Sequence, residues 1–183
     1  MLDLKFTPFP EIKSKRLLLR KMTDADAAEI LFLRSDDTVM QYIDREKTKS
    51  LEEAIAFIQK INTAVDNNES IMWAIALQDK PDTMIGNICF WRIDKQHYRS
   101  EVGYMLHPGF WGKGIMQEAV GAVVDFGFNE IKLHSIEGHI NPENIASGVV
   151  LEKCGFVREA YFKESFYFKG KFSDAAVYSL LAK

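Results

Sequence analysis

The segment from His107 to Glu118, which is HPGFWGKGIMQE, constrains the fold of this chain more than any other. An apolar run ends at His107-Pro108, because a residue before proline is kept out of the helical region. Gly112 and Gly114 then stand directly before a helical pattern, so a glycine turn joins a strand to a helix. Free N–H groups at such a helix start attract an anion such as a phosphate, and Lys113 adds a positive charge. The segment predicts either a phosphate-binding turn or a tight glycine turn without a ligand.

Two common phosphate motifs do not fit this turn. A P-loop has four residues between its glycines and then Lys-Ser/Thr, whereas Gly109 and Gly112 are closer together and Gly114 follows the lysine. A dinucleotide-binding fingerprint would have its third glycine at the position of Gln117. The turn therefore belongs to neither class.

The rest of the chain alternates between strand-like and helix-like patterns. Ser50 and Glu53 form a capping box at one helix start, and Asn141-Pro142 is expected to begin another helix that ends at Gly155. Strands are predicted at 16–21, 71–77, 84–93, 101–106, 134–140, 156–168 and 172–181, and helices at 23–34, 50–65, 114–128 and 141–155. This order predicts an α/β chain with a mixed sheet that carries helices on its faces.

Composition places the chain among ordinary globular proteins. Its 183 residues fit a single domain over 1–183, and 47% are hydrophobic. A net charge of -3 gives no basic face for nucleic acid. No stretch reaches the ~20 apolar residues of a membrane span, and the N-terminal residues lack a signal-peptide pattern. Cys89 and Cys154 lie in apolar surroundings and are expected to be buried free thiols. We therefore expect a cytoplasmic protein that contacts neither membrane nor nucleic acid.

Several motifs together resemble one family. The loop Pro108-Gly-Phe-Trp-Gly-Lys-Gly114 is similar to the pyrophosphate-binding loop of the GNAT N-acetyltransferases, and of their RimJ/RimL branch in particular. The resemblance extends over nearly the whole chain, through the segments 16–20, 101–104, 144–156, 170–174 and 178–181. It implies the GNAT acyl-CoA N-acyltransferase fold, a central mixed, mostly antiparallel sheet flanked by helices. It also implies transfer of an acetyl group from acetyl-CoA to a primary amine.

The resemblance also implies which residues bind the cofactor. The pyrophosphate of acetyl-CoA is expected over the loop residues, Trp111, Gly112, Lys113, Gly114, Ile115 and Met116. Backbone N–H groups of a bulged strand at Met105 and Leu106 are expected to hold the thioester carbonyl, and Asn144 the pantetheine arm. Met116 stands where the family usually has a small residue, so we expect it to crowd the loop.

Glu101 and Ser147 are the candidate catalytic residues. Glu101 is the only acid of an apolar strand, and burial would raise its pKa toward that of a general base. The alternative is a structural ion pair with Arg99. Many GNAT enzymes have a tyrosine at the position of Leu151 that protonates the leaving thiolate, and the resemblance to the RimL-like branch implies that Ser147 takes this role here and also binds the cofactor. Otherwise Ser147 is a packing residue. A second candidate base is Glu164, near the position where the RimL-type enzyme has a glutamate.

The amine acceptor is less constrained. The resemblance favours the α-amine of a protein or peptide N-terminus; a polyamine or other small amine is the alternative, and a non-catalytic acyl-CoA-binding domain is a third. No recognised zinc spacing occurs among the histidines, so no metal is expected. The mixed-charge segment 44–49 is expected to be a solvated loop that can border the acceptor cleft. A homodimer is left open.

Overall fold

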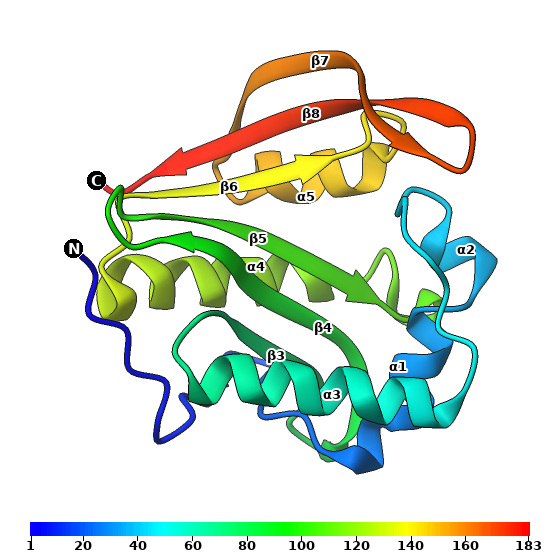
Figure 1. The fold of residues 1–183 in the computed structure, drawn as a ribbon. Helices are drawn as coiled ribbons and strands as arrows, with labels where there is room; N and C mark the ends of the chain where they lie inside the picture. Colours follow the sequence, from blue (N-terminus) through cyan, green and yellow to red (C-terminus); the bar gives the residue numbers. More distant parts are fainter.

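The computed structural model describes residues 1–183, and its strands form one sheet of eight strands in the order β1-β2-β3-β4-β5-β6-β8-β7 (Figure 1). The strands are β1 Ile12–Lys13, β2 Leu17–Arg20, β3 Ile71–Leu77, β4 Lys80–Asp94, β5 Arg99–Leu106, β6 Ser135–Ile140, β7 Val157–Phe168 and β8 Lys171–Leu181. The helices are α1 Ala27–Leu33, α2 Asp37–Met40, α3 Leu51–Asp66, α4 Ile115–Phe126 and α5 Ile145–Lys153. The predicted mixed sheet with flanking helices is confirmed, and it is mostly antiparallel.

One pair of neighbouring strands is parallel, and this pair opens the sheet. β5 pairs with β6 only from Arg99–Glu101 to Ser135–Glu137. Beyond Glu101 and Glu137 the two strands no longer pair with each other. β5 stays paired with β4 to its end, and β6 stays paired with β8. Figure 1 shows β5 and β6 diverging toward the arrowheads of the two strands. Polar backbone edges are therefore left open in the middle of the sheet.

The two faces of the sheet carry different helices. α1 and α3 pack on β3 and β4 around a small cluster that includes Ile30, Ile58 and Ala74, all fully buried. α4 packs on the opposite face, where Val120 and Val123 join the larger core with Trp73 (Figure 1). Burying each of these isoleucine and valine side chains contributes about 1.5–3 kcal/mol, which holds both layers against the sheet. The open edges of β5 and β6 thus lie in a rigid frame.

The structure corrects several predicted boundaries. The predicted helix 141–155 is wrong at its start: α5 begins at Ile145, and its N-cap is Asn144, whose side chain accepts from the N–H of Ser147. Asn141 caps a turn instead, since its Oδ1 accepts from the N–H of Glu143 at 2.9 Å. The first turn of the predicted helix 23–34 is a 3-10 turn, Asp24–Asp26. The short elements β1 and α2 were not predicted.

Other expectations concern the cysteines and the membrane. Cys89 and Cys154 are both free, but only Cys89 is buried, while Cys154 is half-buried. None of the helices combines the length and the apolar character that a membrane crossing requires.

Candidate active site

The glycine turn of residues 107–114 has the backbone conformation that its glycines permit. Gly112 has φ +71° and Gly114 has φ +70°, a left-handed region that other residues rarely adopt. Gly114 is the N-cap of α4 and offers no side chain to the helix start. The first turn of α4 is therefore open to whatever lies in front of it.

This turn presents a row of unpaired donors. From Gly112 to Gln117, no backbone N–H donates to an acceptor within the protein. Lys113 adds its ammonium group, which donates to the carbonyl of Gly109 at 2.7 Å and stays beside the turn. Consecutive N–H groups at the positive end of a helix form an anion site. The geometry therefore fits the pyrophosphate that the sequence predicted here.

Contacts from elsewhere in the chain fix this loop. Arg16 donates through Nε to Glu118 at 2.7 Å and through a second nitrogen to the carbonyl of Lys113 at 3.0 Å. Trp111 donates through Nε1 to the carbonyl of Leu106 at 2.7 Å. Met116 is buried and packs in the core. The expected crowding of the loop by Met116 is therefore wrong, because its side chain points into the protein.

A cavity of about 900 Å³ lies at the opening between β5 and β6. Its wall includes the predicted residues Glu101, Met105, Asn144 and Ser147. It also includes residues of α3, the loop before α3 and the β7–β8 hairpin, which lie far apart in the sequence. The glycine turn and Leu106 lie outside this wall. The structure thus brings the predicted catalytic residues together and places the predicted pyrophosphate site next to the cavity, where β5 ends.

The bulge expected at Met105 and Leu106 is absent from the ladder between β4 and β5. That ladder runs without a shift from Gly86 opposite Leu106 to Trp91 opposite Glu101. Its irregularity lies between Trp91 and Asp94 instead. Residues 102–106 nevertheless have no strand partner on the β6 side, because β5 diverges from β6 there.

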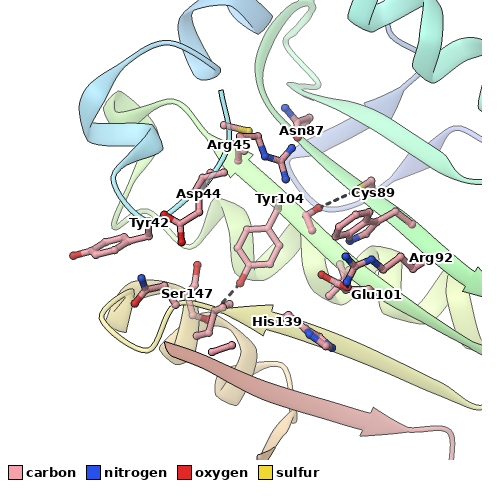
Figure 2. Close-up of a pocket in the computed structure, with 18 of the residues that line it drawn as sticks. Tyr42, Asp44, Arg45, Asn87, Cys89, Arg92, Glu101, Tyr104, His139 and Ser147 are labelled. Carbon is pink, nitrogen blue, oxygen red and sulfur yellow. Dashed lines mark hydrogen bonds and ion pairs between the residues drawn. The ribbon is translucent and has the colours of Figure 1, made fainter. Parts of the chain in front are cut away.

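Glu101 lies on the cavity wall and is 8% exposed. Its Oε2 accepts from a guanidinium nitrogen of Arg92 at 3.1 Å. Arg99, the partner in the alternative interpretation, pairs instead with Glu137 on β6 at 3.3 Å. Burial raises the pKa of Glu101 above its ordinary value, although the nearby charges of His139 and Arg92 act in the opposite direction. Figure 2 shows Arg92 and Glu101 side by side, with His139 across the opening.

Ser147 and Asn144 lie at the start of α5. Oδ1 of Asn144 accepts from the N–H of Ser147 at 3.1 Å, which leaves its amide N–H₂ group without a partner in the protein. No hydrogen bond holds the hydroxyl of Ser147, which lines the cavity. Leu151, one turn further along α5, is fully buried. Asn144 and Ser147 therefore keep free donors beside the opening between β5 and β6.

Tyr104 was not singled out from the sequence. Its hydroxyl donates to the carbonyl of Ser147 at 3.4 Å across the opening, and burial raises its pKa to about 12 (Figure 2). The phenol thus stays protonated at neutral pH and lies on the cavity wall. The sequence offered one signal for it. Because position 151 on α5 is a leucine instead of a tyrosine, a phenol beside α5 had to come from another element, such as β5.

Glu164, the second candidate base, lies away from the cavity. It is exposed, with φ +49°, inside a register shift of β7, and its N–H donates to Asp174 at 2.8 Å. Its side chain does not contribute to the cavity wall, whereas Phe162 and Phe166 of the same strand do. Glu164 therefore lies beside the cavity wall without forming part of it.

The segment 44–49 borders the cavity, as expected. Asp44 accepts from the hydroxyl of Ser173 on β8 at 2.6 Å, and Glu46 pairs with Lys169 at 3.0 Å. Both contacts tie the segment to the β7–β8 hairpin. Asp44 and Arg45 line the cavity. This part of the chain therefore closes one end of the cavity rather than being only a solvated loop.

Known proteins share this architecture. The pattern of the acetyltransferase (GNAT) domain family matches residues 16–157. The N-acetyltransferase YoaA of Bacillus subtilis is 34% identical over 94% of this chain and 97% of its own length. The spermidine N(1)-acetyltransferase of Vibrio cholerae is 26% identical over 88% of this chain and 90% of its own. A solved structure of RimL, a ribosomal L7/L12 alpha-N-protein acetyltransferase in complex with coenzyme A, superposes with a TM-score of 0.85 over 94% of this chain and 98% of that one, at 23% identity.

Proposed function

The chain belongs to the GNAT acetyltransferase family and is an N-acetyltransferase, and we propose that its acceptor is the α-amine of a protein or peptide N-terminus, as in the RimJ/RimL branch. The observation that carries this proposal is Glu101, a buried acid with a raised pKa on the wall of a cavity large enough for a peptide end. A general base works best when its pKa approaches the working pH. Glu101 is the carboxylate whose environment supports that role.

The residues present fit acetyl-CoA as the co-substrate, because the row of unpaired N–H groups from Gly112 to Gln117 suits a pyrophosphate. We assign the pyrophosphate to Trp111 through Met116 and the pantetheine arm to the free amide of Asn144. The backbone at Met105 and Leu106, which has no strand partner on the β6 side, is assigned to the acetyl end. When bound, acetyl-CoA supplies a thioester carbonyl that an amine can attack.

The chain's own residues handle two protons in this scheme. Glu101 accepts, directly or through a water, the proton that the acceptor nitrogen loses as it forms the amide bond. The hydroxyl of Ser147, with that of Tyr104 beside it, donates a proton to the sulfur as the carbon–sulfur bond breaks. The proton that Glu101 gains and the proton that the hydroxyl loses return through solvent. The products are an amide and coenzyme A.

An α-amine suits a single base of this kind. Its pKa is about 7.7–8.0, against about 10.4 for a lysine amine, so a sizeable fraction is neutral near pH 7. Phe162 and Phe166 line the cavity from the β7–β8 hairpin and are half exposed, which offers apolar surface to a peptide chain leaving the site. Two free cysteines support a reducing compartment such as the cytoplasm.

A polyamine acceptor is the second candidate, because Asp44 and Asp174 also line the cavity and a spermidine acetyltransferase is among the relatives. Both acids are already engaged, however. Asp174 accepts from the hydroxyl of Tyr161 and from the N–H of Glu164, and Asp44 accepts from Ser173. Carboxylates held by these contacts attract a cation less strongly than free ones.

The test is a panel of amines with acetyl-CoA, read as release of coenzyme A. The panel contains short peptides with free Ala or Ser N-termini, spermidine, and lysine peptides with blocked N-termini. We expect the highest kcat/KM for the free N-terminal peptides. Higher values for spermidine or for blocked lysine peptides would overturn the proposed acceptor, and no release with any amine would point to a non-catalytic acyl-CoA-binding protein.

A further inference from the structure

Three basic residues that line the cavity have no acidic partner. They are Arg34 at the end of α1, Arg45 in the loop before α3, and Lys60 on α3. None of them takes part in an ion pair of this protein. Basic side chains gathered around one cavity without a counter-charge repel each other, so this arrangement costs free energy in the empty protein.

Arg34 is held in place with most of its donors unused. Its Nε donates to the hydroxyl of Thr48 at 3.1 Å, and its guanidinium carbon lies 4.1 Å from the ring centre of Phe57. A guanidinium has five N–H donors, and these contacts use one of them. The remaining donors of Arg34 form a fixed fork at the cavity, the geometry that binds a carboxylate or a phosphate bidentately.

Arg45 adds a second guanidinium near the first. Burial lowers the pKa of Arg34, and the charge of Arg45 lowers it further, so the two groups lie close enough to interact. Burial raises the pKa of the Cys89 thiol on β4, and the charge of Arg45 acts in the opposite direction, so Arg45 also lies near Cys89. The side chain of Arg45 makes no hydrogen bond within the protein. Figure 2 shows Arg45 and His139 on opposite sides of Tyr104. Arg45 therefore reaches the cavity from the side away from β6.

The acids of the cavity offset these charges only in part. Glu101 pairs with Arg92, on another part of the wall. Asp174 is engaged by Tyr161 and by the N–H of Glu164. Asp44 and Asp174 also line this part of the wall, so the three cations Arg34, Arg45 and Lys60 face two carboxylates and leave one positive charge in excess.

We propose that Arg34 and Arg45, with Lys60 at the rim, bind a carboxylate of the acceptor, so that this enzyme acetylates amines that carry an acidic group near the reacting nitrogen. The inference rests on the proposed function and narrows it to N-termini followed by acidic residues. The same chemistry is offered by the α-carboxylate of a free amino acid or dipeptide. A polyamine, in contrast, would bring its cations toward Arg34 and Arg45, neither of which is in an ion pair.

The experiment compares matched acceptors on the wild-type enzyme. Three peptides begin with Ser-Glu-Glu, Ser-Gln-Gln and Ser-Lys-Lys and end in an amide, and a Ser-Ala dipeptide is used with a free carboxylate and as its amide. We expect the KM for the glutamate peptide to be about 10-fold lower than that for the glutamine peptide, since one good charge-assisted contact amounts to roughly that factor.

Variants separate the carboxylate site from general effects. Arg45→Gln should bring the KM ratio of the glutamate and glutamine peptides close to one, and Arg45→Glu should favour the lysine peptide. Arg158→Gln makes the same charge change on β7, outside this cavity, and should retain the wild-type ratio. The KM for acetyl-CoA is measured in parallel, because the alternative role of these cations is to bind the phosphates of acetyl-CoA.

The possible outcomes are distinct. An unchanged ratio in Arg45→Gln, or a raised KM for acetyl-CoA that affects all peptides equally, would overturn the carboxylate site. A preference of the wild type for the lysine peptide or for spermidine would overturn it as well. Turnover of the free dipeptide alone, without turnover of its amide or of the longer peptides, would overturn the proposal that the acceptor is a longer peptide. The carboxylate site would be retained.

Discussion

The carboxylate of Glu101 on β5 lies 3.1 Å from the guanidinium of Arg92 on β4, and the two side chains differ greatly in exposure. Arg92 has φ +50° within the register shift of β4, and its guanidinium stacks 4.2 Å above the ring centre of Trp91. The irregular backbone thus directs an exposed cation over a buried acid. Because burial prevails, the pKa of Glu101 stays raised despite its partner.

Glu101→Gln should separate catalysis from binding. The variant keeps the shape of the side chain and removes its basicity, so we expect turnover to fall about 10²-fold or more while affinity for acetyl-CoA is retained. Calorimetric titration with acetyl-CoA and steady-state rates measure the two effects. Thermal unfolding serves as the control, because an ionised buried acid costs stability and the glutamine variant should unfold at no lower temperature. Near-normal turnover at neutral pH would remove the base role from Glu101.

The pH dependence of kcat/KM should report the Arg92 contact. A base must be ionised to act, so a raised pKa of Glu101 places the acidic limb of the profile above that of an ordinary glutamate, about pH 4.3. Arg92→Gln removes a cation that lowers this pKa, and the limb should move to higher pH. Arg99→Gln is the matched control, because Arg99 pairs with Glu137, and it should leave the limb in place. Equal shifts in both variants would contradict a specific role for Arg92.

The same ion pair illustrates what the sequence could and could not predict. Strand alternation and turn residues located β3, β5 and the last two strands well, because those signals are local. Arg99, two residues away on the same strand, was the alternative partner that the sequence offered for Glu101. Arg92 was not, since a cross-strand partner depends on register and on the shift at Trp91.

The candidate site shows the same division between local and long-range information. The glycine turn and Asn144 follow from sequence motifs, although Asn141-Pro142 carried an equally good local signal for a helix start and proved to cap a turn. Arg45 and Tyr104 reach the cavity from segments far apart in the chain. Only the fold brings them together, so no spacing in the sequence could indicate that they line one cavity.

The glycine turn should control cofactor affinity. Gly114→Asp introduces a carboxylate in front of the unpaired N–H groups and a side chain at φ +70°, so we expect calorimetry to detect no binding of acetyl-CoA. Gly121→Asp is the control on the same helix, where a Cβ atom would meet nothing within 4 Å. It should bind acetyl-CoA as the wild type does. A folded Gly114→Asp protein with unchanged affinity would refute the assignment of the pyrophosphate to this turn.

Ser147→Ala and Tyr104→Phe should distinguish the two hydroxyls beside the opening of the sheet. Neither substitution should abolish activity, because a thiol with a pKa near roughly 8.5 can leave as an unprotonated thiolate. We expect Ser147→Ala to lower kcat only modestly, by about 3-fold.

Tyr104→Phe should lower kcat more, by about 10-fold, because its phenol is held at the opening by the carbonyl of Ser147 and remains protonated up to a pKa of about 12. Pre-steady-state release of coenzyme A and the KM for acetyl-CoA separate a proton donor from a binding group. If Ser147→Ala raises the KM for acetyl-CoA while kcat holds, Ser147 binds the cofactor and does not donate the proton. If both variants turn over at the wild-type rate, the thiolate leaves unaided, and neither hydroxyl acts as the acid.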